Sequence, residues 1–231
     1  MITKDSLDIL KKINIITDKV ILKSPITTIN SDSNDIVANI KVEGVDEPMG
    51  LYELSKFNSI LSLFDDAEVN RDGQTLKIKS KNSSAIFTLA DINIMDSYNK
   101  PDSLVQKLFE FPSVSEFVLN TSDLASFKKA SSIFSDLNSI TVRGQDGNTQ
   151  VCLNMTGRFE TSSNNFNKEY LNTSSKEFLI NIPTESFNKL PIFDEDYKVQ
   201  VKYNENKNAY RIVFSTSKVA ILVACSVNWL V

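Results

Sequence analysis

The sequence contains no histidine, which is the commonest general base and the commonest metal ligand in proteins. Its two cysteines, Cys152 and Cys225, lie far apart on stretches predicted to be separate strands. The first residues show no apolar targeting core, so both are predicted to be reduced structural thiols. The longest apolar run, 219–225, covers only about a third of a membrane span. We therefore predict no metal, no cofactor and no membrane partner.

An excess of positive charge is also missing. The chain has 25 basic and 29 acidic side chains and a net charge of −4, so no global field indicates a nucleic-acid partner. Any such partner would need lysines gathered on one surface. A hydrophobic content of 41% and a charged content of 23% are typical of a soluble globular protein. The 231 residues suffice for two domains of ordinary size.

Two stretches of the chain repeat one pattern of apolar residues. Residues 54–64 read Leu-x-x-Phe-x-x-x-x-x-x-Phe, and residues 124–134 read the same. Each pattern predicts a helix with one apolar face. Each helix is followed by two predicted strands that meet at an Asp-Gly turn, at 72–73 and at 146–147. The repetition predicts a duplicated architecture.

The predicted fold class is α+β, with two similar domains that each pack two helices on antiparallel sheets. The first helix begins at Thr3 or Asp5, and further helices are predicted at 53–64, 122–134 and 184–190. A strand is predicted at 158–161, a polar loop at 162–167 and one closing strand at 218–227. The predicted division is an N-terminal domain at 1–90, an interdomain connector at 91–111 and a C-terminal domain at 112–231.

Paired carboxylates are the candidates for catalysis. Asp65 with Asp66, and Asp194 with Asp196, could hold a divalent metal in an enzyme. Each pair lies where a helix passes into a strand, and aspartate is favoured in such turns for backbone reasons alone. The sequence has no glycine-rich phosphate loop, no serine elbow and no cysteine–histidine pair. We therefore predict no catalytic residue and a function other than catalysis.

Lysines are concentrated on the predicted helix faces that lie opposite the apolar residues. Acidic residues are few there, because most negative charge lies in turns and connectors. One explanation is a set of ordinary solvated faces. The other is a shared cationic surface that holds the phosphates of duplex DNA without reading its sequence. The lysines concerned are Lys4, Lys11, Lys12, Lys56, Lys128, Lys129 and Lys189.

A series of segments matches one protein family in order along the chain. The segments are KDSLDILK at 4–11, ILKS at 21–24, LYEL at 51–54, ILSL at 60–63 and DDAEV at 65–69. Together they closely resemble the DNA polymerase sliding clamp of T-even-type bacteriophages, and the resemblance continues through the second half. It implies two DNA-clamp domains per chain and a closed homotrimeric ring. Helices from all copies would surround a central hole, with the sheets as the outer wall.

The resemblance implies a processivity factor that encircles duplex DNA. It would tether the viral DNA polymerase, be opened by an ATP-dependent clamp loader, and work in the cytoplasm of the infected bacterial host. The seven lysines named above would then face the DNA. The alternative is a monomeric DNA-binding processivity or adaptor protein with one basic face.

Partners of this family bind through a peptide tail in an apolar pocket near the connector and the chain end. The resemblance places this pocket at Ile92, Ile94, Met95, Trp229, Leu230 and Val231. The alternative is that these side chains simply pack against the last strand. Subunits of the family join through edge strands, so we expect strand 85–89 of one copy to face 157–170 of the next.

Overall fold

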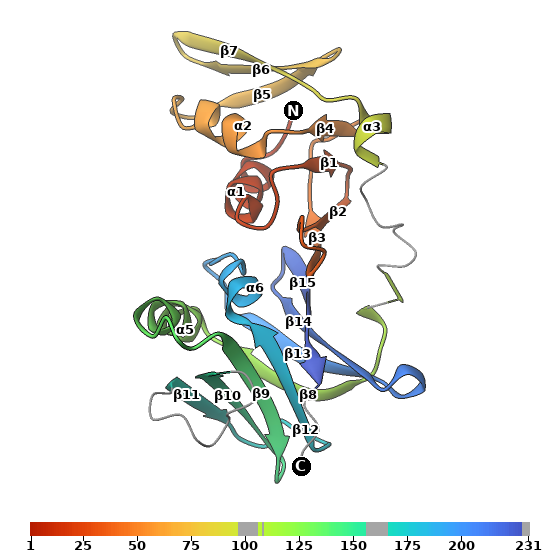
Figure 1. Cartoon of the computed structure of the whole chain (residues 1–231). Coiled ribbons are helices and arrows are strands. Elements are labelled where there is room, and N and C mark those ends of the chain that lie inside the picture. The colour runs from red at the N-terminus through yellow and green to blue at the C-terminus, as the bar shows by residue number, and fades with distance from the viewer. Residues whose placement is uncertain (97–105, 108, 156–165, 228–231) are drawn as a thin grey trace. The chain divides into compact units, whose positions relative to one another are not determined.

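The structure is a computed structural model, and it describes residues 1–96, 106–107, 109–155 and 166–227 (Figure 1). The chain divides into two compact units, Met1–Asp102 and Ser103–Val231. The domain and connector limits given above stay a prediction. Among the described residues, no helix is both long enough and apolar enough to span a membrane.

The first unit is built from helices and short antiparallel strands. Its elements are α1 (Lys4–Ile13), β1 (Val20–Leu22), β2 (Ile26–Asn30), β3 (Ile36–Lys41), β4 (Met49–Leu51), α2 (Leu54–Leu61), β5 (Glu68–Asp72), β6 (Thr75–Ser80), β7 (Ser83–Thr88) and α3 (Ile92–Asp96). Within the unit β1 pairs with β4, β2 pairs with β3, and β5, β6 and β7 form a three-stranded sheet. The short helix α3 lies at the start of the predicted connector.

The first helix begins where its sequence predicts. The Thr3 side chain accepts a hydrogen bond from the Ser6 N–H and so caps α1. Leu7, Leu10 and Ile13 lie on its buried side, as their spacing predicts. By contrast, α2 ends at Leu61, which is earlier than predicted.

The predicted turn at 72–73 is shifted by one residue. Asp72 pairs with Thr75 in the ladder between β5 and β6, so Gly73 and Gln74 form the connection. Gly73 has a φ of 59°, a left-handed conformation that glycine adopts without strain. The turn predicted at 146–147 lies in its predicted place, because Gln145 pairs with Asn148.

The second unit contains two larger sheets. Its elements are β8 (Ser113–Leu119), α5 (Thr121–Ile133), β9 (Ser139–Gln145), β10 (Asn148–Asn154), β11 (Phe166–Tyr170), β12 (Phe178–Pro183), α6 (Thr184–Asn188), β13 (Tyr197–Asn204), a 3-10 turn at Glu205–Lys207, β14 (Ala209–Ser215), β15 (Val219–Ala224) and β16 (Ser226–Val227). One sheet has the order β11-β10-β9-β12-β16, and β15, β14, β13 and β8 are neighbours in the other.

The second unit corrects two predictions. The predicted loop at 162–167 runs into β11, which begins at Phe166 and pairs with β10. The closing segment 218–227 is two strands, because β15 pairs with β14 whereas β16 pairs with β12 in the other sheet. An apolar run looks the same whether it stays in one sheet or passes between two. The strand predicted at 158–161 lies outside the described residues.

The order of elements explains the repeat seen in the sequence. The series β4-α2-β5-β6-β7, β8-α5-β9-β10-β11 and β12-α6-β13-β14-β15 each place one strand, one helix and three strands in succession. The chain start, α1-β1-β2-β3, follows the same order without its first strand. The repeated pattern lies in α2 of the first unit and in α5 of the second. The repeat is therefore smaller than a compact unit.

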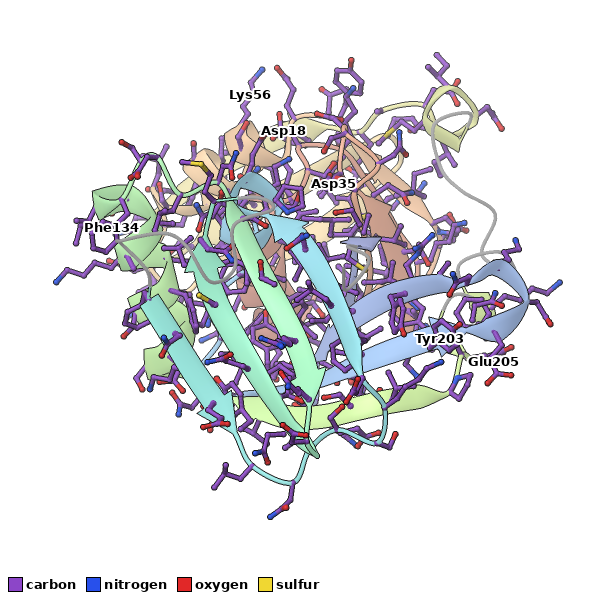
Figure 2. The ribbon with its side chains drawn as sticks, turned by 60° about the horizontal axis from the view of Figure 1, so that its bottom comes forward. Asp18, Asp35, Lys56, Phe134, Tyr203 and Glu205 are labelled. Atoms are coloured by element: carbon purple, nitrogen blue, oxygen red, sulfur yellow. The ribbon has the colours of Figure 1, made fainter. Side chains whose placement is uncertain are left out.

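The two phenylalanines that close the repeated pattern are not part of the helices. Phe64 lies after the end of α2, and Phe134 is the residue that follows the last helical residue of α5 (Figure 2). Both side chains are partly exposed. Leu54, Phe57 and Leu61 form the buried side of α2. The apolar face is thus shorter than predicted.

Candidate nucleic-acid interface

A chain of polar contacts holds the helices α1 and α2 of the first unit side by side (Figure 1). Asn58 of α2 donates from Nδ2 to the Leu10 carbonyl oxygen at 3.3 Å and to Asn14 Oδ1 at 3.2 Å. Asn14 in turn donates to Asp18 Oδ1 at 3.3 Å. The same carboxylate oxygen accepts from the Ser55 N–H at 2.6 Å and so caps α2. The outer faces of α1 and α2 are therefore fixed relative to each other.

Replacing Asn58 with alanine is expected to lower the free energy of unfolding by about 1–2 kcal/mol, because the Leu10 carbonyl and Asn14 lose a partly buried hydrogen-bond donor. Ser59 lies on the exposed side of the same helix, so Ser59→Ala is a matched control and should stay within about 0.5 kcal/mol of the parent protein. Urea denaturation measures both. Equal losses in the two variants would contradict the role assigned to Asn58.

The predicted DNA-facing lysines of the first unit lie on α1 and α2. Lys4, Lys11 and Lys56 are exposed and Lys12 is partly exposed, and Figure 2 shows the Lys56 side chain extending away from the ribbon. Three of them have carboxylate neighbours, in the pairs Lys4–Asp66 at 2.7 Å, Lys11–Asp8 at 3.6 Å and Lys56–Glu53 at 3.1 Å.

These exposed ion pairs leave the lysines able to bind phosphate. Hydrogen bonding to Asp66 raises the pKa of Lys4, and the same contact lowers the pKa of Asp66. Solvent-exposed pairs contribute only about 0–1 kcal/mol to stability. A phosphate can therefore replace the carboxylate at small cost. The first unit thus presents cations that are accessible but partly neutralised.

The structure corrects the placement of Lys128. Its ammonium group donates to the carbonyl oxygen of Asn188 at 2.7 Å and to that of Leu190. Burial lowers the pKa of Lys128 to about 8. The reason is helical geometry, because Lys128 follows the buried Leu124 by four residues and so lies on the same side of α5. Lys128 fastens α5 to α6 and is not a cation free to meet DNA.

The remaining lysines of the second unit differ from each other. Lys129 is exposed, and its ammonium has no ion-pair partner among the residues that the structure describes. Lys189 is only partly exposed and lies 3.8 Å from Glu185. It follows the end of α6, which stops at Asn188 and is shorter than predicted. Lys129 is therefore the clearest exposed cation on α5 and α6.

One aspartate of each predicted pair, Asp66 and Asp196, has a structural contact in a turn or at a helix start. Asp66 has a φ of 54° in the turn after α2 and pairs with Lys4. Asp196 Oδ1 accepts a hydrogen bond from the Thr121 N–H at 2.9 Å, at the start of α5. Within the described residues, no cluster of histidine, cysteine or acidic side chains could hold a metal ion. The geometry gives Asp66 and Asp196 structural roles.

Two residues of the predicted partner pocket, Ile94 and Met95, line a cavity of the first unit. The cavity has a volume of about 120 Å³, and Ile94 and Met95 of α3 line it together with Ile21, Asn30 and Tyr52. Ile94 is 65% exposed at its edge, whereas Met95 is buried. Both polar atoms of the Asn30 amide are buried and have no hydrogen-bond partner among the described residues. Ile92, the first residue of α3, is partly exposed. The other predicted pocket residues, Trp229, Leu230 and Val231, lie outside the described residues.

Each unit has a sheet that ends in a strand with one unpaired edge within the described residues. β7 pairs only with β6, and β11 pairs only with β10. On β7 the Ile86 side chain is 65% exposed, which is unusual for an isoleucine on a sheet. Unpaired strand edges favour pairing with another chain.

Comparison with known proteins shows which fold this is. No family model matches the sequence, and no curated protein matches it. The structure, however, superposes on PCNA from A. fulgidus, solved with the C-terminal region of FEN-1, with a TM-score of 0.70 and 12% identity over 99% of this chain and 98% of that chain. The fold is that of a DNA sliding clamp.

Other clamps show the same likeness. PCNA from Entamoeba histolytica matches with a TM-score of 0.65 and 15% identity over 95% of this chain and 94% of that chain. The DNA polymerase III β subunit from Thermotoga maritima matches with a TM-score of 0.63 and 12% identity, and here the match covers 95% of this chain but 62% of the longer subunit. The predicted α+β clamp fold is confirmed.

Proposed function

We propose that this protein is a DNA polymerase sliding clamp, a ring that encircles duplex DNA and tethers a replicative polymerase. The observation that supports this most strongly is the likeness to the A. fulgidus PCNA structure over nearly the full length of both chains. The repeated order of one strand, one helix and three strands along the chain supports it further.

The proposed DNA surface is formed by lysines on α1, α2 and α5 and by Lys189, which follows the end of α6. With Lys128 removed, it consists of Lys4, Lys11, Lys12, Lys56, Lys129 and Lys189. Lysine suits this role, because a mobile point charge holds phosphates without fixing a sequence register. The pairing of several of these lysines with carboxylates keeps the DNA affinity low. A closed ring needs little affinity, since its topology retains the DNA.

We propose that copies of the chain join through β7 and β11 to form a homotrimer. Each of these strands has an unpaired edge, and pairing β7 of one copy with β11 of the next would cover both. The number of copies rests on the resemblance of the sequence to T-even-type phage clamps, which implies a trimer. Ile86 would be covered at this contact.

The finer assignment rests on the resemblance of the sequence to T-even-type phage clamps. On that basis the polymerase is viral, an ATP-dependent loader opens the ring, and the compartment is the cytoplasm of an infected bacterium. The partner-peptide site would include Ile92, Ile94 and Met95 of α3, with the chain end 229–231. The protein would perform no chemistry of its own.

Light scattering at micromolar concentration is expected to give a mass three times the 25.9 kDa of one chain. Loaded on nicked circular plasmid, the protein should remain bound at high salt and dissociate once the plasmid is linearised. The salt-resistant retention follows from topology, because electrostatic binding falls steeply with salt.

The competing function is a monomeric DNA-binding processivity or adaptor protein. Two results would support the monomeric protein and contradict the ring. One is a mass of 25.9 kDa at every concentration. The other is equal dissociation of the protein from circular and linear DNA as the salt concentration rises.

A further inference from the structure

The edge strand β11 is attached to its unit by three alternate side chains. Phe166 packs edge-to-face on Phe127 of α5, with ring centroids 4.9 Å apart. Tyr170, at the other end of the strand, packs on Phe117 of β8 at 4.4 Å. Between them, the Lys168 ammonium makes an ion pair and hydrogen bond with Asp123 of α5.

Asp123 is an unusual partner, because its carboxylate is almost completely buried. Its side chain is only 7% exposed, whereas that of Lys168 is 41% exposed. It lies in the first turn of α5, where a negative charge is favoured. Burial and the Asp123 charge together raise the pKa of the nearby Tyr170 hydroxyl. No other cation is paired with Asp123 among the described residues, so Lys168 neutralises a charge that solvent does not reach.

The backbone alone holds β11 weakly. Its ladder with β10 covers Phe166 to Tyr170, and its other edge is unpaired within the described part of the chain. A strand that offers an edge to another chain must keep its register and its twist while that edge is empty. The Lys168–Asp123 pair lies at the middle residue of β11 and supplies this restraint.

We propose that the Asp123–Lys168 pair is a latch that keeps β11 in the conformation required for pairing with β7 of a second copy. This inference rests on the proposed self-assembly through these edges. It makes Lys168 and Asp123 positioning residues for assembly, because their side chains act through the placement of β11 and not by pairing with the second copy. The Asp123–Lys168 pair also connects α5, which carries Lys129, to β11, the strand proposed to join two copies.

The test compares Lys168→Met with Lys168→Arg, which keeps the charge, and with Lys198→Met as a matched control. Lys198 makes an exposed pair with Glu116 at 2.9 Å in the same unit, between β13 and β8. Sedimentation over a range of concentrations should show self-association weakened at least about tenfold by Lys168→Met, which corresponds to about 1.4 kcal/mol. Lys168→Arg and Lys198→Met should associate as the parent protein does.

Hydrogen exchange on the dissociated single chain provides a second measurement that does not depend on the ring. Lys168→Met should lose amide protection at 166–170 and in the facing part of β10, with protection of β13 and β14 unchanged. Unaltered protection of β11, or a uniform loss across the second unit, would overturn the latch. A parent protein that is monomeric at all concentrations would contradict the proposed ring and leave the exchange result to decide the latch.

Discussion

Replacing Lys11, Lys12 and Lys129 with glutamate is expected to abolish retention on circular DNA and stimulation of the polymerase, while the ring stays assembled. Each substitution changes the local charge by two units, on every copy. The surface that would face the DNA then becomes acidic and repels phosphate. We expect at least about a hundredfold loss of loading, since phosphate neutralisation dominates sequence-independent binding. Gel-based loading on nicked plasmid and primer-extension length measure the two effects.

The control for this variant keeps the total charge change and moves it off the helices. Lys41, Lys79 and Lys207 are exposed and lie on β3, on β6 and in the turn before β14. Their replacement with glutamate should leave loading within about twofold of the parent protein, because charges farther from the DNA than a Debye length of about 8 Å are largely screened. Loading that survives in the helix variant, or that fails equally in both, would refute a DNA surface made of these helices.

Replacing Lys128 with methionine is expected to lower the free energy of unfolding by about 1.5–3 kcal/mol, although the sequence pattern groups it with Lys129. The substitution removes a charged donor from the carbonyl oxygens of Asn188 and Leu190. Methionine keeps the length and the apolar stem of the side chain. Lys129→Met is the control and should change stability by no more than about 0.5 kcal/mol. Urea denaturation of both variants measures the difference.

The stability supplied by Lys128 should also depend on pH in a defined direction. Burial lowers its pKa from 10.5 to about 8, so between these values the unfolded chain binds more protons at this position than the folded chain does. The free energy of unfolding of the parent protein, relative to Lys128→Met, should therefore rise from pH 8 to pH 10.5. A difference that is flat or falls across this window would contradict the buried position of Lys128.

Local spacing predicted α1, α2, α5, α6 and most strands, whereas α3 lies in a stretch predicted to be a connector. Leu7, Leu10 and Ile13 identified the buried side of α1, and the capping Thr3 identified its start. The strand β11 was missed, since Phe166 and Tyr170 are its only apolar or aromatic residues and the three residues between them are polar. The division of 218–227 between two sheets could not be predicted, because both pieces are equally apolar.

The candidate site shows the same limit. Exposed lysines on α1 and α2 followed from the helical pattern, because their positions depend only on the spacing of nearby apolar residues. Lys128 was misplaced because its partners, Asn188 and Leu190, lie about sixty residues away along the chain. The Asp123–Lys168 pair had no sequence signal, since an aspartate in the first turn of a helix is ordinarily exposed there.

By itself the sequence determined that the chain is an α+β protein without histidine, that it repeats one helix-and-strands unit, and that lysines gather on its helices. These properties depend on composition and on residues a few positions apart. Only the tertiary structure decided which lysines remain exposed, where the repeat falls within the two units, and which strands keep an unpaired edge. Those properties depend on contacts between residues distant along the chain, which no local spacing records.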